Sequence, residues 1–89
     1  MSQNDSLCNS YVNLGVILES EGFDREALEY LNKASSITQN PRVKAEIIYR
    51  MAKLYNGLGE KRNALRSLQY AVSLDPEHSK ARLMLKKLQ

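Results

Sequence analysis

The chain has 89 residues, the length of one small domain, so two folded domains with separate cores are excluded. Its 43% hydrophobic and 26% charged residues are typical of an ordered protein and exclude a disordered one. Residues 1–41 carry six acidic and two basic side chains (net −4), whereas residues 42–89 carry eleven basic and four acidic ones (net +7). This division of charge along the chain is consistent with solvated helix faces, with an acidic ligand at the basic end, or with head-to-tail self-association.

The N-terminal segment does not resemble a secretory signal. The first ten residues contain no basic region followed by an apolar run, and no later stretch approaches the ~20 apolar residues that span a bilayer. Cys8 is the only cysteine, so an internal disulfide is impossible and a reducing compartment is favoured. We therefore expect a cytoplasmic protein with no membrane partner. Residues 1–6, which precede the first predicted helix, are expected to form a flexible N-terminus.

Two amphipathic helices are predicted in the first half of the chain. Four apolar residues at helical spacing form the first stripe: Leu7, Tyr11, Leu14 and Leu18. Gly22 ends this helix, because glycine adopts the left-handed conformation of a helix C-terminus, and Asp24 is the expected N-cap of the next helix. The second stripe consists of Ala27, Leu28, Leu31 and Ala34.

Three further helices are expected after two Asn/Asp-Pro pairs. Asn40-Pro41 and Asp75-Pro76 each combine a capping residue with proline at the first helical position. The third and fourth helices, separated by a break at residues 57–59, have these apolar stripes: Ile48, Met51, Ala52 and Tyr55, then Ala64, Leu65, Leu68 and Ala71. The last helix, over about residues 76–89, buries Ala81, Met84, Leu85 and Leu88.

The two halves of the chain repeat one unit. A shift of 37 residues gives seven identities within fifteen positions: Gly22/Gly59, Arg25/Arg62, Ala27/Ala64, Leu28/Leu65, Leu31/Leu68, Ala34/Ala71 and Ser36/Ser73. Self-similarity at this period is typical of helical repeat proteins.

These motifs resemble the tetratricopeptide repeat. Tyr11-x-x-Leu14-Gly15-x-x-Leu18 and Ile48-x-x-Met51-Ala52-x-x-Tyr55, each followed by the spaced alanines of the second helix, are similar to its pattern. The resemblance implies an all-α, right-handed α-solenoid within residues 7–89. It would contain repeats over about 8–41 and 45–78 and a capping helix over about 76–89. The period exceeds the usual 34 residues, and the surplus falls around residues 42–44.

The resemblance also implies a protein-binding adaptor or scaffold whose ligand lies against the first helix of each repeat. Ten residues off the core stripes of those helices form the candidate groove: Asn9, Val12, Val16, Glu46, Tyr49, Lys53, Asn56, Lys80, Leu83 and Lys87. An apolar row flanked by lysines suits an acidic or amphipathic peptide or helix.

One known ligand class of this family is not expected. Members that bind the C-terminal carboxylate of heat-shock chaperones use a clamp of lysine, asparagine and arginine. The corresponding positions here hold Val12, Val16, Arg50, Lys80 and Met84, of which only Lys80 fits. We therefore predict no affinity for that chaperone tail.

Other function classes have weaker support in the sequence. Cys8 and His78 stand far apart, so no metal site is expected, and we predict a packed cysteine and a plain surface histidine. No cofactor is expected, nor catalysis, because nucleophilic catalysis would need a base positioned near a serine or cysteine and no glycine-rich phosphate-binding loop occurs. Nucleic-acid binding by the basic half and head-to-tail self-assembly remain alternatives.

Overall fold

The structure, a computed structural model that describes residues 3–89, is all-α. Five helices follow one another in the described part of the chain: α1 (Gln3–Ser20), α2 (Asp24–Ile37), α3 (Pro41–Gly57), α4 (Lys61–Leu74) and α5 (Ser79–Leu88). Helix α1 pairs with α2, α3 pairs with α4, and the two hairpins meet where α2 packs against α3. Helix α5 packs on α4. This helical repeat solenoid confirms the predicted fold class and the number of helices.

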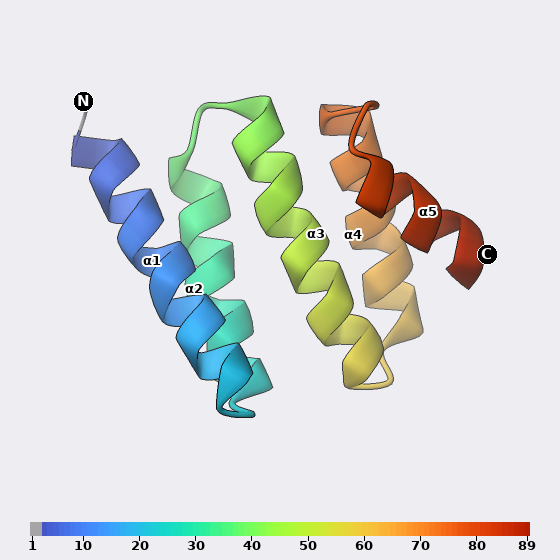
Figure 1. Ribbon diagram of the computed structural model, residues 1–89, viewed down its shortest axis with the longest axis horizontal. Helices are drawn as coiled ribbons and strands as arrows, with labels where there is room; N and C mark the ends of the chain where they lie inside the picture. The colour runs from blue at the N-terminus through green and yellow to red at the C-terminus, as the bar shows by residue number, and fades with distance from the viewer. Residues whose placement is uncertain (1–2) are drawn as a thin grey trace.

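The first helices of the hairpins share one side of the stack. Figure 1 shows α1, α3 and α5 nearer the viewer, with α2 and α4 behind them. The Cα atoms span 38 × 29 × 16 Å. Within residues 3–89, no helix combines the length and apolarity needed to cross a membrane.

The core depends on small residues where helices meet. Seven alanines are completely buried: Ala27, Ala34, Ala45, Ala52, Ala64, Ala71 and Ala81. Leu31 and Leu68, which the repeat relates to each other, are the largest fully buried side chains. The predicted stripes of the second to fifth helices are therefore the packed faces of α2 to α5, with Tyr55, Leu65, Met84, Leu85 and Leu88 partly buried.

Glycine ends the first helix of each hairpin, as the repeat predicts. Gly22 and Gly59 have φ angles of 87° and 79°, which side chains rarely tolerate. The amide groups of Phe23 and Glu60, which follow them, donate to the carbonyl oxygens of Leu18 and Tyr55. Equivalent turns thus reverse the chain in both repeats.

Helix capping differs from the prediction at two of three starts. Asn40 caps α3, because its Oδ1 accepts from the amides of Arg42 and Val43. The prediction for Asp24 is wrong: it is the first residue of α2, and Phe23 occupies the N-cap position without a side-chain hydrogen bond.

The other wrong start is that of the last helix. Helix α5 begins at Ser79 rather than at Pro76, and Asp75 is the C-cap of α4. The carboxylate of Asp75 accepts from the amide of Glu77 in the intervening turn.

At the other end of the chain, α1 begins at Gln3. It therefore includes residues 3–6 of the segment expected to be flexible, and residues 1–2 of that segment lie outside the described residues.

The buried side of α1 also differs from the predicted stripe. Leu7 and Leu14 are 45% and 43% exposed, whereas Cys8 is buried at 3%. Tyr11 and Leu18 do pack against the core, as expected. Apolar residues on a helix at the end of a stack can face either its hairpin partner or a preceding helix. No helix precedes α1 in the described residues, so Leu7 and Leu14 remain exposed although they are apolar.

Candidate functional site

A hollow between α3 and α5 brings four of the predicted groove residues together. Tyr49, Lys80, Leu83 and Lys87 line it with Met84, which also packs against the core. The hollow has a volume of about 310 Å³, and all the residues that line it belong to α3 and α5. Two helices that are distant in sequence therefore supply one apolar floor with lysines at its edge.

His78 packs against Tyr49, one of the residues that line this hollow. Its ring lies 5.0 Å from the ring of Tyr49, and its Nε2 lies 2.5 Å from Oε2 of Glu46. Its Nδ1 accepts from the amide of Ala81 at 3.1 Å and so caps α5. One side chain therefore joins the start of α5 to the wall of α3.

The sequence prediction of a plain surface role for His78 is wrong. The side chain is only 11% exposed, because α3 and the first turn of α5 enclose it. A histidine directly before a helical run was the available signal, since the residue there can accept a hydrogen bond from the helix N-terminus. Histidine is an uncommon N-cap, and the Asp75-Pro76 pair offered a more familiar start.

The electrostatic balance at the hollow is positive. The ammonium group of Lys53 lies 5.1 Å from the centre of the Tyr49 ring, and Lys80 and Lys87 are exposed residues that line the hollow. Oε2 of Glu46 is paired with His78, and Oε1 of Glu46 lies 3.9 Å from Nε of Arg50. The carboxylate of Glu46 is thus already engaged within the protein, while the lysines are available to an anionic ligand.

The structure places the remaining predicted residues elsewhere. Asn9 lines a different hollow, of about 330 Å³, between α1 and the start of α3. Val12 packs against the core, Val16 is half-buried, and Asn56 is exposed near the end of α3. The residues of α1 therefore do not share the hollow that contains Tyr49.

Cys8 is a packed residue, as predicted. Its Sγ donates to the carbonyl oxygen of Ala34 at 3.5 Å, and burial together with the nearby carboxylate of Asp5 raises the pKa of the thiol. A raised pKa keeps the thiol protonated and weakly nucleophilic. Among the described residues, no group of three or more His, Cys, Asp or Glu side chains is arranged to hold a metal ion.

Comparison with protein families agrees with the two-hairpin architecture. The family model described as "Tetratricopeptide repeat" matches residues 9–41 and again residues 45–78. The chain belongs to the tetratricopeptide-repeat family. A search of curated proteins finds no match.

The two matched segments of this tetratricopeptide-repeat protein are separated by three extra residues. The unmatched residues 42–44 follow Pro41 in the first turn of α3, where the sequence analysis places the surplus over the usual period. Helix α5 follows the second repeat as a capping helix. Tetratricopeptide repeats are in general protein–protein interaction modules and are typically non-catalytic. At this general level, the function of the chain is protein binding.

Proposed function

We propose that this protein is an adaptor or scaffold that binds an acidic, amphipathic peptide segment of a partner protein along α3 and α5. The observation that carries the proposal is the hollow lined by Tyr49, Leu83 and Met84, with Lys53, Lys80 and Lys87 around it. An apolar side chain of the ligand would fill the hollow, and flanking carboxylates would face the lysines.

Apolar contact and charge have different effects in such a complex. Leu83 is 60% exposed, so covering it removes apolar surface from water, at about 25 cal/mol per Å². The lysines lie at the solvent-exposed rim, where ion pairs are weak and screened by salt. The apolar anchor therefore supplies most of the affinity, and the lysines favour acidic ligands and speed association.

The experiment is a selection of peptides from a random displayed library, followed by titration of an enriched peptide into ¹⁵N-labelled protein. The largest shift changes are expected at Tyr49, Leu83 and Lys87. Shift changes confined to α2 and α4 would show that the ligand uses the other side of the stack and would contradict the proposal.

Two matched variants test whether the hollow contributes to the affinity for the peptide. Leu83→Glu is expected to weaken the selected peptide by at least about tenfold, because it places a charge in the apolar anchor site. The control is Leu14→Glu, which makes the same change at a similarly exposed leucine on α1 and should leave the affinity unchanged. Equal affinity for both variants would exclude the hollow as the binding site.

A further inference from the structure

Helix α1 exposes apolar residues whose counterparts in the second repeat are buried. Leu14 and Ile17 are 43% and 53% exposed. The 37-residue repeat relates them to Met51 and Leu54, which are only 6% and 4% exposed. The same two positions therefore face solvent in one repeat and the interior in the other.

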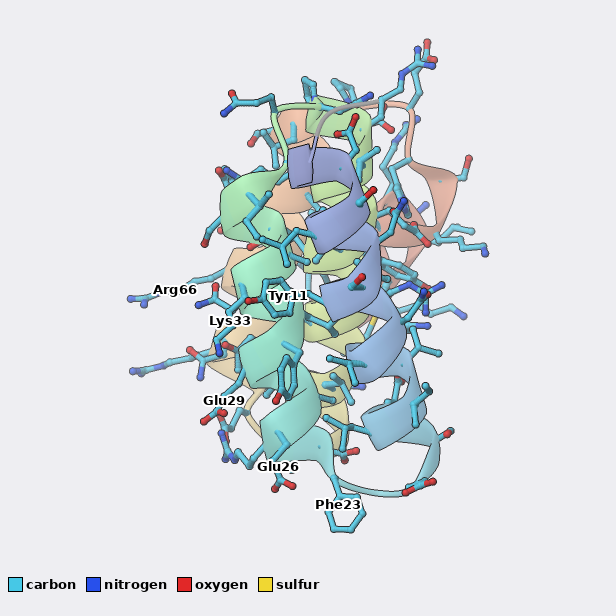
Figure 2. All side chains as sticks on the ribbon, turned by 90° about the vertical axis from the view of Figure 1, so that its left-hand side faces the viewer. Tyr11, Phe23, Glu26, Glu29, Lys33 and Arg66 are labelled. Atoms are coloured by element: carbon cyan, nitrogen blue, oxygen red, sulfur yellow. The ribbon has the colours of Figure 1, made fainter. Side chains whose placement is uncertain are left out.

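The difference arises from what lies in front of each helix. Helix α2 packs against α3, and Leu28 of α2 lines one crevice with Met51 and Tyr55 of α3. No helix of the described chain covers the corresponding side of α1, which faces the viewer in Figure 2. Leu14 and Ile17, together with the exposed Leu7, thus form an unfilled stacking face, which we call the front face.

Helix α5 is incomplete in the complementary way. Helices α1 and α3 each pair with a following helix, whereas α5 is the last helix of the described chain. Arg82 and Lys86 are exposed and line a hollow of about 380 Å³ with Ser79 and Leu83. We call this surface the rear face.

The helices at the two ends of the stack differ in charge. Helix α1 contains Asp5 and Glu19 and no basic residue, whereas α5 contains four basic residues and no acidic one. Exposed Glu21, Glu26 and Glu29 add to the negative charge of the first hairpin, α1 and α2, which we call the acidic end.

The two basic residues of the first repeat offset only part of this charge, because residues 1–41 carry six acidic side chains. Arg25 forms an ion pair with Glu60 of the second repeat. The ammonium group of Lys33 lies 5.7 Å and 5.2 Å from the ring centres of Tyr11 and Tyr30. The acidic end of one copy therefore meets its electrostatic complement at the basic end of another.

We propose that copies of this chain associate head to tail, with the front face of one copy seated on the rear face of the next. Leu14 and Ile17 would contact the apolar part of the rear face at Leu83, with Arg82 and Lys86 beside the acidic end. Such a heterologous contact leaves one free end of each kind, so it continues into longer stacks unless the rotation closes a ring.

The size of the ends sets the strength of the contact. An end of about 29 × 16 Å on each copy buries roughly 900 Å² in total, below the ~1,600 Å² of a standard stable interface. The association is therefore weak, and the mass must be followed by sedimentation at protein concentrations up to about 1 mM. The average mass is expected to rise above 10.1 kDa with concentration.

Two blocked variants test the polarity of the contact. The front-blocked variant carries Leu14→Glu and Ile17→Glu, and the rear-blocked variant carries Arg82→Glu and Lys86→Glu. Each alone should remain monomeric, whereas an equimolar mixture should form a 1:1 complex and stop there, because one intact face of each kind remains. Formation of that complex also shows that both variants are folded.

Other outcomes overturn the proposal. A rear-blocked variant that still dimerises alone would indicate contact between two front faces, and a wild-type mass of 10.1 kDa at every concentration would exclude self-association. The control variant carries Val43→Glu and Tyr70→Glu at exposed sites on α3 and α4 and should associate like the wild type. Leu83 lines both hollows, but Arg82 and Lys86 line only that of the rear face. Peptide binding should therefore survive in the rear-blocked variant, which separates a failure of this proposal from a failure of the proposed function.

Discussion

Gly15 shows how a single residue sets the approach of two helices. A Cβ at this position would lie 2.9 Å from two side-chain carbons of Leu31 and 3.3 Å from the carbonyl oxygen of Ala27. Leu31 is completely buried, so it has little room to move. The absence of a side chain at Gly15 is therefore a packing requirement between α1 and α2.

The residue-scale prediction is that Gly15→Ala destabilises the protein by about 1–3 kcal/mol, because the added methyl group overpacks the contact with Leu31. Urea unfolding followed by circular dichroism measures the change. Gly57→Ala is the control: nothing lies within 4 Å of a Cβ there, and alanine favours the helix, so its stability should be equal or up to about 1 kcal/mol higher. Equal midpoints for wild type and Gly15→Ala would refute the packing argument.

At the scale of the element, the start of α5 depends on a contact with α3. Because Nδ1 of His78 accepts from the Ala81 amide, its Nε2 carries the proton and donates to Glu46. Ala81 is the one fully buried residue of this ten-residue helix. Short isolated helices are marginal in water, so α5 needs both its cap and its packing on α4.

His78→Ala removes the cap and the link to Glu46, and we expect a loss of about 1–2 kcal/mol and faster amide exchange throughout α5. His78→Asn should recover part of the loss, because asparagine is a favourable N-cap but is too short to replace the ring against Tyr49. Urea unfolding and amide hydrogen exchange of the three proteins provide the measurement. Unchanged exchange in α5 of the alanine variant would show that His78 does not hold the helix in place.

At the scale of the whole molecule, stability should decrease from the centre of the stack toward its ends. Helix α3 contains six buried residues and has neighbours on both sides, through α2 and α4. Helix α1 lacks a covering helix on its front face, and α5 contacts mainly α4. Repeat proteins gain stability from such nearest-neighbour contacts, so the end helices have fewer of them.

The whole-molecule prediction is a gradient of amide protection. Exchange should be slowest in α3 and the helices paired to it, and fastest in the first turns of α1 and in α5. Hydrogen exchange monitored by NMR at a concentration where the protein is monomeric gives the rates, with intrinsic rates as the reference. Uniform protection of all five helices would indicate a single cooperative unit and contradict the gradient.

Much of the candidate site was predictable from the sequence, but its assembly was not. Periodicity placed Tyr49, Lys80, Leu83 and Lys87 off the core stripes of their helices, and the structure brings these four together. The same reasoning grouped Val12 and Val16 with them, although the hollow contains neither. Helical spacing assigns a residue to a side of its own helix, whereas the distance to another helix depends on the stacking angle and on intervening loops.

The sequence by itself determined the helices, the two repeats and the turns at Gly22 and Gly59, because helical period and backbone conformation are local properties. Only the tertiary structure decided which apolar residues of α1 are buried and where α5 begins. Leu14 is exposed and Met51 is buried although they occupy equivalent positions, because burial depends on the neighbouring helix. His78 likewise caps α5 in a position stabilised by Tyr49 and Glu46, residues about thirty positions earlier in the chain.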